Sequence, residues 1–295
     1  MTQHFFIGVD GGATKTQVRV EDAQGNLLGQ EVGGPASLRL SPEQAWQSII
    51  AALAKILLPN TLNLRDPHCR FHAGMGLAGT EVEAALQAYL QHPHTFASLQ
   101  VTSDAHVACL GAHGGGDGAL IVIGTGTVGY QIENRQHTKV GGWGFPHGDE
   151  GSGAWLGLQA FQHSLQCWDG RQPKSLLAQA LKDYFGSNQQ RVVAWASAAN
   201  STAYAALAPI ILEQYAKGDD MAKHLLQSAG AHIDNIAVAL IQAQRQTKTL
   251  LPCSLVGGIA NFVQPFLGKS LQSRLAPCQQ TPEQGAILMI RNALA

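Results

Sequence analysis

Short apolar runs separated by polar turns characterise the first part of the chain. After a capping Ser41, a helix with one apolar side is predicted from Pro42 to about Pro59. Before it, strand-like patterns predict consecutive antiparallel strands, which means that the glycine loop after Asp10 joins one strand to the next. The three predicted strands are His4–Asp10, Gln17–Glu21 and Leu27–Val32.

The pattern then changes to alternating strands and helices. A strand is expected within residues 70–79, a helix over Glu81–Leu90, and a further strand that leads into a helix beginning near Asp104. The opening pattern then recurs in GALIVIGTGTVGYQIENRQHTKVGG as strand, glycine and threonine loop, strand, polar turn and strand. The loops at Asp10 and Gly124 lie about 114 positions apart, a spacing that favours a duplicated domain.

The rest of the chain is mostly helical in pattern. The segment CSLVGGIANF predicts one more strand, which reaches a pair of glycines before a helix start. The glycine-rich stretch Gly114–Gly118 is the expected hinge between the two halves. The helices expected between these features are Ala154–Cys167, Pro173–Tyr184, Arg191–Ala199, Ala203–Tyr215 and Asp220–Gln244.

Length and composition narrow the classes of function. The 295 residues suffice for two domains, and 19 basic against 20 acidic residues lack the charge footprint of a nucleic-acid or anionic-membrane binder. We therefore expect a small-molecule partner. The five cysteines are widely spaced and form no C-x-x-C pair, which argues against disulfides or a zinc site and fits a reducing cytosol. No apolar stretch approaches the roughly 20 residues of a membrane helix, so a soluble cytoplasmic protein is expected.

The loop after the first strand has the composition of an anion site. It is not a Walker A motif, because Thr14 precedes Lys15 and a strand follows. Glycines let backbone N–H groups approach a phosphate, and Asp10 is expected to hold Mg²⁺ through water. For this loop alone, a glycine hairpin with a solvated aspartate is the alternative. The candidate phosphate-binding residues are Gly11, Gly12, Thr14, Lys15 and Thr16.

A second loop of the same kind strengthens the phosphate hypothesis, because two such hairpins could face each other across a cleft. Asp104 has two interpretations, as the N-cap of its helix or as a general base that accepts a proton from an attacking hydroxyl. In LVGGIANF, glycines could let an adenine or ribose lie against the backbone, although such pairs also occur where a helix packs closely on a sheet. The residues concerned are Gly124, Thr125, Gly126, Thr127, Gly257 and Gly258.

The segment Gly141–Gly157, GGWGFPHGDEGSGAWLG, contains seven glycines, two acids and two tryptophans. A loop that presents Asp149 and Glu150, and closes at Ser152 before a helix, suits a polyol whose hydroxyls need carboxylate acceptors and backbone donors. His147 is expected to be a hydrogen-bonding or exposed residue rather than a catalytic one.

Five motifs resemble those of the N-acetylglucosamine and glucosamine kinases and follow one another in the same order. They are GVDGGATKT, SDA, IGTGTVG, GGWGFPHGDEGSGAW and LVGGIA. These enzymes form part of the BadF/BadG-type ATPase family, in the superfamily of sugar kinases, heat-shock ATPases and actin. The resemblance covers nearly the whole chain. It implies an α/β fold of two ribonuclease-H-like domains, each a five-stranded mixed sheet flanked by helices, with a cleft between them. Residues 1–115 plus 281–295 would form the first domain, and residues 116–280 the ATP-binding domain.

The same resemblance assigns an activity and roles. It implies transfer of the γ-phosphate of ATP, with Mg²⁺, to the 6-hydroxyl of N-acetylglucosamine or glucosamine, in a cytoplasmic homodimer. Asp104 would be the base, Asp149 would bind sugar hydroxyls, and the loops 10–16 and 124–127 would hold phosphates and Mg²⁺. Gly257 and Gly258 would border the adenine. The expected sugar-binding residues are Ser37, Asp104, Gly144, Asp149 and Glu150.

Two questions stay open at this level. Where animal N-acetylglucosamine kinases carry Asn, Ser and Asn near the sugar, this chain has Ser37, Ala78 and Val128, which leaves the acetyl group of the acceptor undecided. The second is the class of protein, since related ATPases activate 2-hydroxyacyl-CoA dehydratases through an iron–sulfur cluster shared across a dimer. We instead interpret Cys109 and Cys167 as inert residues of the core rather than as ligands of such a cluster. A sugar-binding regulator without turnover is a third possibility.

Overall fold

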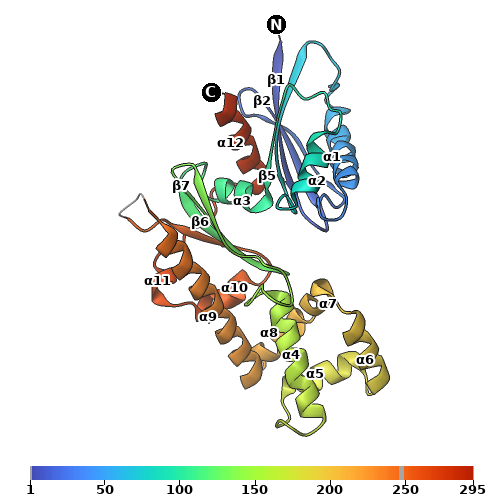
Figure 1. The fold of residues 1–295 in the computed structure, drawn as a ribbon, viewed down its shortest axis with the longest axis vertical. Coiled ribbons are helices and arrows are strands. Elements are labelled where there is room, and N and C mark those ends of the chain that lie inside the picture. The colour runs from blue at the N-terminus through green and yellow to red at the C-terminus, as the bar shows by residue number, and fades with distance from the viewer. Residues whose placement is uncertain (1, 246–248, 295) are drawn as a thin grey trace. The chain divides into compact units, whose positions relative to one another are not determined.

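The computed structural model describes residues 2–245 and 249–294, and the chain divides into two units (Figure 1). The first unit comprises Met1–Gly118, Ile132–His137 and Pro277–Ala295, and the second comprises Ala119–Gln131 and Thr138–Ala276. Each unit has its own large cluster of buried apolar side chains. Within the described ranges, no helix is both long enough and apolar enough to cross a membrane.

The first unit is built on a five-stranded mixed sheet with the strand order β3-β2-β1-β4-β5. The first three strands pair antiparallel, while β4 pairs parallel with both β1 and β5. The predicted opening strands are therefore confirmed, and the glycine loop joins β1 directly to β2. The strands are β1 (Gln3–Gly11), β2 (Thr16–Asp22), β3 (Leu27–Gly33), β4 (Cys69–Leu77) and β5 (Ser98–Ser103).

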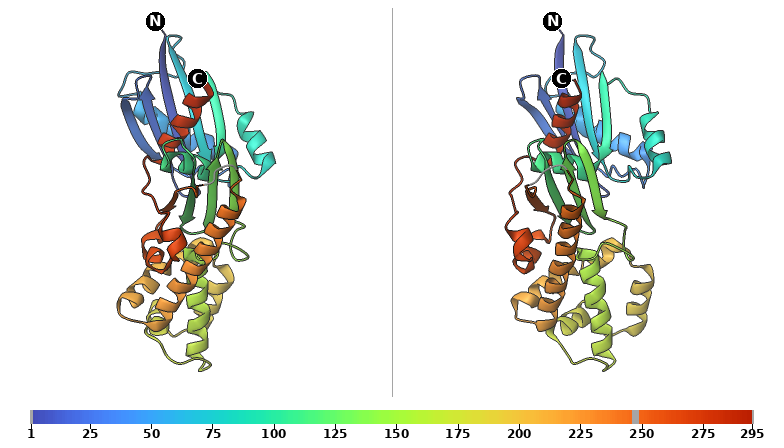
Figure 2. Two further views of the ribbon diagram at one scale, coloured as in Figure 1. Left: turned by 90° about the vertical axis from the view of Figure 1, so that its left-hand side faces the viewer. Right: turned by 60° about the vertical axis from the view of Figure 1, so that its left-hand side comes forward.

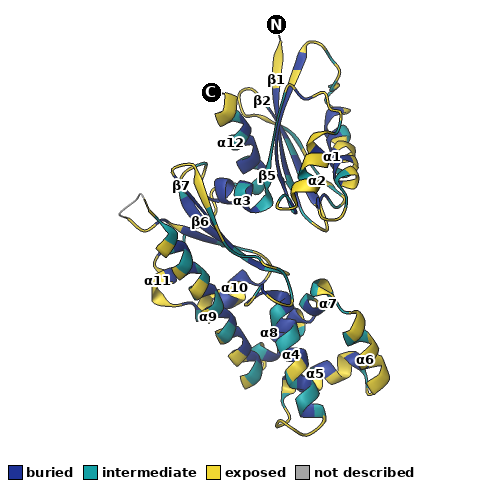
Figure 3. Ribbon diagram, viewed as in Figure 1, coloured by how far each residue is buried: buried dark blue, intermediate teal, exposed yellow. Residues whose placement is uncertain are grey.

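Helices cover both faces of this sheet (Figure 2). On one face α1 (Pro42–Leu57) packs with α2 (Glu83–Leu90), and on the other α3 (Asp104–Ala112) packs with α12 (Pro282–Leu294). As predicted, Ser41 caps α1, its hydroxyl oxygen accepting a hydrogen bond from the Gln44 N–H at 3.1 Å. Burial follows these layers, since β1, β4 and the inward faces of the helices are mostly covered, while the edge strand β3 has no buried residue (Figure 3).

The last helix, α12, lies unusually close to the sheet because glycines face it. A Cβ added at Gly8 would lie 1.9 Å from the Glu283 carbonyl oxygen, and one at Gly74 would lie 2.0 Å from that of Ala286. Any side chain at these strand positions would therefore displace the helix. The close approach places the first turn of α12 beside the end of β1.

The second unit contains a four-stranded sheet in the order β8-β7-β6-β9, with β6 and β9 parallel. Where a fifth strand is expected, the described chain has a single parallel bridge between Cys253 and Leu275. The strands are β6 (Gly118–Ile123), β7 (Thr127–Glu133), β8 (Gln136–Gly141) and β9 (Cys253–Val256).

The predicted single helix over Ala203–Tyr215 is wrong, because the structure has two helices there, α7 (Ser201–Ala205) and α8 (Ala208–Ala216). Pro209 lacks the N–H that would continue a helix, so it lies in the first turn of a new one. The remaining helical segments are α4 (Gly153–Trp168), α5 (Leu176–Phe185), α6 (Gln189–Ala198), α9 (Asp220–Ala243), α10 (Ala260–Val263), α11 (Lys269–Gln272) and a 3₁₀ turn, Gln264–Phe266.

Candidate functional site

The loop after β1 is a tight hairpin held by its own backbone and by one buried hydroxyl. The Gly12 N–H donates to the Lys15 carbonyl oxygen at 3.0 Å, and the buried Thr16 hydroxyl donates to the Gly34 carbonyl oxygen at 2.8 Å. Thr16 therefore anchors the loop through its hydroxyl. Ala13, Thr14 and Lys15 are exposed, so Thr14 and Lys15 are the polar side chains that this loop presents to solvent.

Asp10 lies at the end of β1, in the middle of the sheet, and is half-buried. Burial is the main cause that raises the pKa of Asp10 to about 7. The negative charges of Asp104 and Glu283 raise it further, while Lys15 lowers it. Three carboxylates from β1, α3 and α12 thus interact at the end of the first strand.

Asp104 is the first residue of α3, directly after β5. The capping role belongs to the preceding residue, because the Ser103 hydroxyl oxygen accepts a hydrogen bond from the His106 N–H at 3.2 Å. The Asp104 Oδ1 accepts a hydrogen bond from the Ala105 N–H at 2.8 Å. The interpretation of Asp104 as the N-cap is therefore wrong, and the helix start does not depend on its carboxylate as a cap.

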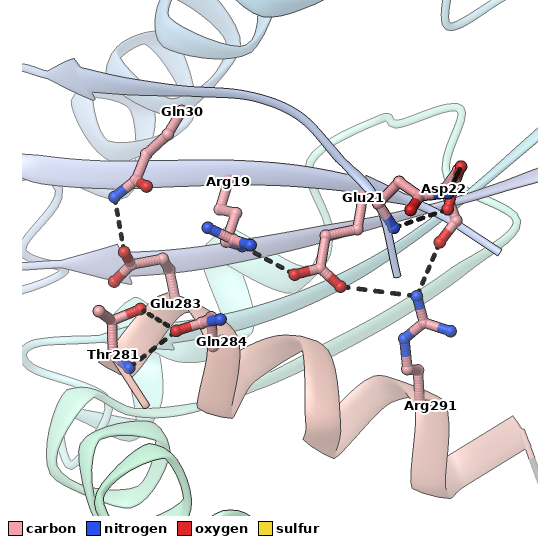
Figure 4. A network of polar contacts seen from close by, with 9 residues as sticks. Arg19, Glu21, Asp22, Gln30, Thr281, Glu283, Gln284 and Arg291 are labelled. Atoms are coloured by element: carbon pink, nitrogen blue, oxygen red, sulfur yellow. Dashed lines mark hydrogen bonds and ion pairs between the residues drawn. The ribbon is translucent and has the colours of Figure 1, made fainter. Parts of the chain in front are cut away.

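Sequence reasoning missed Glu283, in the first turn of α12. Its side chain is only 1% exposed, and its Oε1 accepts a hydrogen bond from the Gln30 Nε2 at 2.6 Å (Figure 4). The other oxygen, Oε2, is buried and has no hydrogen-bond partner among the described residues. From the sequence, an acid after Pro282 looks like an ordinary first-turn residue that complements the helix dipole.

A hydrated divalent cation fits this group of carboxylates. Nowhere in the described ranges do three His, Cys, Asp or Glu side chains form a group that could hold a metal ion directly. Mg²⁺ usually keeps several waters and binds few protein carboxylates. A cation would oppose both the burial and the repulsion that raise the pKa of Asp10, and its water shell would supply donors to an unpaired oxygen such as Glu283 Oε2. The residue that would hold it is Asp10.

In the second unit, the loop between β6 and β7 meets the loop that was predicted to bind sugar. The Gly124 N–H donates to the Gly126 carbonyl oxygen at 3.0 Å, and the Gly153 N–H of α4 donates to the Gly124 carbonyl oxygen at 2.8 Å. A Cβ at Gly126 would lie 2.8 Å from the Asp149 Oδ2. Glycine at this position therefore allows the Asp149 carboxylate to lie directly against the candidate phosphate loop.

The loop around Asp149 is shaped by hydrogen bonds at both ends. The Gly148 N–H donates to the Gly144 carbonyl oxygen at 2.8 Å, and Ser152 caps α4 through its hydroxyl oxygen. Asp149 has a φ of 64°, an uncommon conformation for a residue other than glycine. Glu150 and His147 are exposed, as expected for His147.

Thr127 lies in a different setting from the rest of its loop. Its hydroxyl is buried without a hydrogen-bond partner in the described part of the chain. It borders a cavity of about 260 Å³ that is also lined by Glu150, and by His232 and Asn235 of α9. These two α9 residues were not predicted, since the apolar stripe of that helix hides them in the sequence.

Gly257 and Gly258 differ in what surrounds them. Gly257 has a φ of 111°, and a Cβ there would lie 2.3 Å from the Ile123 carbonyl oxygen. A Cβ at Gly258 would have no atom within 4 Å. The backbone therefore requires the first glycine, while the second faces open space in which a ring could lie.

The structure groups some of the predicted residues and leaves others apart. Asp10 and Asp104 interact within the first unit, and Asp149 lies beside Gly126 within the second. Ser37 is buried in the segment between β3 and α1, where its carbonyl oxygen accepts hydrogen bonds from the following turn. That the two phosphate loops face each other across a cleft stays a prediction.

Comparison with known proteins gives related enzymes along the whole chain. It is 32% identical to the glucosamine kinase GspK of Vibrio cholerae over 97% of this chain and 95% of that protein. It is 24% identical to an N-acetylmuramic acid/N-acetylglucosamine kinase of Clostridium acetobutylicum over 88% of this chain and 86% of that one.

Solved structures show the same fold. A candidate N-acetylglucosamine kinase of Chromobacterium violaceum superposes with a TM-score of 0.87 at 34% identity, over 97% of this chain and 98% of the other. A glucokinase of the ROK family from Streptomyces griseus, solved with glucose and AMPPNP, superposes with a TM-score of 0.57 at 16% identity, over 98% of this chain and 99% of that one, and supports the fold alone. The sequence profile of the BadF/BadG/BcrA/BcrD ATPase family matches residues 7–288. The chain therefore belongs to the BadF/BadG/BcrA/BcrD ATPase family.

Proposed function

We propose that the protein is an ATP-dependent amino-sugar kinase that phosphorylates the 6-hydroxyl of glucosamine or N-acetylglucosamine. The observation that carries the proposal is the carboxylate of Asp104, which begins α3 without capping it and interacts with Asp10 at the end of β1. A base beside a cation-binding aspartate is the arrangement that phosphoryl transfer to a hydroxyl needs. The names of the relatives support the sugar as acceptor.

In this mechanism Asp104 accepts the proton of the sugar hydroxyl as its oxygen attacks the γ-phosphorus. The new bond joins the sugar oxygen to that phosphorus, and the bond to the bridging oxygen of ADP breaks. Lys15, Thr14 and the backbone of the β6–β7 loop would hold the phosphates, and Asp10 would hold Mg²⁺ through water. When bound, Mg²⁺ neutralises charge that develops on the phosphate oxygens.

Asp149 and Glu150 are the proposed sugar-binding acids, together with Gly144 and Ser37. Carboxylates accept hydrogen bonds from sugar hydroxyls, and the position of Asp149 against Gly126 would bring the sugar site next to the phosphate loop. Glucosamine and N-acetylglucosamine both remain acceptors in this proposal. Comparison of their kcat/KM values, together with those of glucose and N-acetylmannosamine, decides between them.

Cys109 and Cys167 give no support to an activator with a shared iron–sulfur cluster. Cys109 is fully buried, and its thiol donates to the Gly118 carbonyl oxygen at 3.4 Å. Burial raises the pKa of Cys167, which makes it a poorer thiolate ligand. A brown protein that contains iron and sulfide would reverse this preference.

The position of transfer has a direct test. The product of a preparative reaction with glucosamine is expected to show phosphorus coupling to the two protons on carbon 6 in an NMR spectrum. Coupling to the proton on carbon 1 would contradict the proposed site of transfer. A cytoplasmic homodimer is also part of the proposal, and light scattering behind a sizing column tests the dimer.

A further inference from the structure

Glu283 is a buried carboxylate with half of its hydrogen-bonding capacity unused. One oxygen accepts a hydrogen bond from Gln30 at 2.6 Å, and the other has no hydrogen-bond partner within the described ranges. No ion pair reaches it there either. A buried, unpaired charge is costly, so such a group survives in a fold only where something repays that cost.

The neighbouring charges show that the cost is not repaid by an arginine. On the same face of the sheet, Arg19 contacts Glu21 at 2.7 Å, and Arg291 of α12 reaches Glu21 at 3.6 Å (Figure 4). Both cations are thus directed to Glu21. The start of α12 supplies a partial positive charge to Glu283, but this is a fraction of an elementary charge.

The other charges near Glu283 make its position less favourable still. Its carboxylate repels that of Asp10 of β1, and Asp104 of α3 repels Asp10 as well. Lys15, in the loop after β1, acts on Asp10 in the opposite sense but makes no ion pair with Glu283 in the described structure. Three elements therefore bring carboxylates together near the end of β1, and the cation that acts on Asp10 there is the exposed Lys15.

We propose that Glu283 is a positioning residue for the divalent cation of the kinase, its Oε2 accepting a hydrogen bond from a water molecule bound to that cation. The inference rests on the proposed function for the presence of the cation. It explains why the last helix lies so close to the sheet, since Gly8 and Gly74 permit the approach that brings Glu283 beside Asp10. It also explains why Glu283 keeps an oxygen that no protein group satisfies.

The test measures cation binding without turnover. Melting of the full chain is followed during a titration with MgCl₂ at constant ionic strength, in the presence of excess ADP and without sugar. The melting temperature of the wild-type protein should rise with Mg²⁺. Glu283→Gln should need about ten times more Mg²⁺ to reach half of its own rise, which is the usual effect of removing a group that hydrogen-bonds to a ligand of the metal. Gln keeps the shape of the side chain and an oxygen for Gln30.

Glu21→Gln is the matched control, because it removes the same charge from the same face where two arginines already pair with it. It should leave the Mg²⁺ midpoint unchanged within about two-fold, because two arginines already neutralise this charge. In steady-state assays, Glu283→Gln should raise the KM for Mg²⁺ while kcat at saturating Mg²⁺ stays close to that of the wild type. A structural role through Gln30 alone would leave this KM unchanged.

Glu283→Asp serves as a second variant, because it keeps the charge but withdraws the oxygens by one carbon. It should shift the Mg²⁺ midpoint in the same direction as Gln. A wild-type midpoint in either folded variant, or a wild-type protein that does not respond to Mg²⁺, would overturn the proposal. If Mg²⁺ stabilises the wild type but no sugar stimulates ADP release, the proposed function fails while the role of Glu283 stands.

Discussion

Ser103 and Asp104 are neighbours at the start of α3. The first caps the helix, and the second is the proposed proton acceptor. Ser103 caps the helix through its hydroxyl, so Ser103→Ala should lower the free energy of unfolding by about 1 kcal/mol. Asp104→Asn should leave stability nearly unchanged, keep sugar binding and abolish turnover, because only the proton acceptor is lost. Urea denaturation, sugar-binding calorimetry and ADP release measure the three effects. Loss of stability in Asp104→Asn that equals that of Ser103→Ala would return Asp104 to a capping role.

Asp10 gives the fold a dependence on pH. Its pKa in the folded protein, about 7, lies above the ordinary value of 3.8, so the folded state favours the protonated form. The contribution of Asp10 to stability is therefore full at low pH and is lost as the pH rises from about 4 through about 7. Asp10→Asn cannot ionise. In the absence of Mg²⁺, the free energy of unfolding of Asp10→Asn should therefore rise relative to that of the wild type by on the order of 2 kcal/mol between about pH 5 and pH 7.

Urea denaturation at several pH values measures this difference. Parallel stability curves for the wild type and Asp10→Asn would show that Asp10 ionises as an ordinary exposed aspartate. Asn also removes the charge that would hold Mg²⁺, so the more stable variant is expected to be inactive at every pH.

At the scale of elements, the turn after β9 contains one glycine that the backbone requires and one that is proposed to border the adenine. Gly257→Ala should destabilise the protein by about 2–3 kcal/mol, because of its positive φ and the Ile123 carbonyl oxygen in its way. Gly258→Val should keep stability within about 0.5 kcal/mol. Because its side chain would enter the space assigned to adenine, it should weaken ADP binding about ten-fold, which calorimetry measures. Unchanged ADP affinity in Gly258→Val would place the adenine elsewhere.

The elements themselves were largely predictable where the signal is local. Alternation and turn residues marked the opening strands, and Ser41 with Pro42 marked α1, because these residues act on the backbone next to them. The split between α7 and α8 was missed, although Pro209 carried the signal. There a proline outweighed an apolar pattern.

The candidate site was predictable only in part. The acids and glycines in the loops were visible as motifs, but their neighbours across the fold were not. Glu283 comes to Asp10 because Gly8 and Gly74 let a helix from the far end of the chain lie close to the sheet. His232 and Asn235 reach the cavity beside Thr127 from a helix whose sequence pattern reports only its buried stripe. Such contacts depend on packing between distant segments, which periodicity does not encode.

At the scale of the whole molecule, two sheet-based units carry the two loops and the acids. The first provides Asp10, Asp104 and Glu283, and the second provides the β6–β7 loop with Asp149 against it. Neither unit holds the complete set that the kinase hypothesis needs. The activity is therefore expected to require the full chain, and sugar and nucleotide together.

The most direct test of this account is the rate of ADP release with and without sugar. The full chain with ATP and Mg²⁺ should release ADP slowly alone and much faster when glucosamine or N-acetylglucosamine is added, with a smaller effect of glucose. Asp104→Asn, assayed beside it, should show no such stimulation. Absence of stimulation by any of these sugars in the folded wild-type protein would contradict the assignment as an amino-sugar kinase.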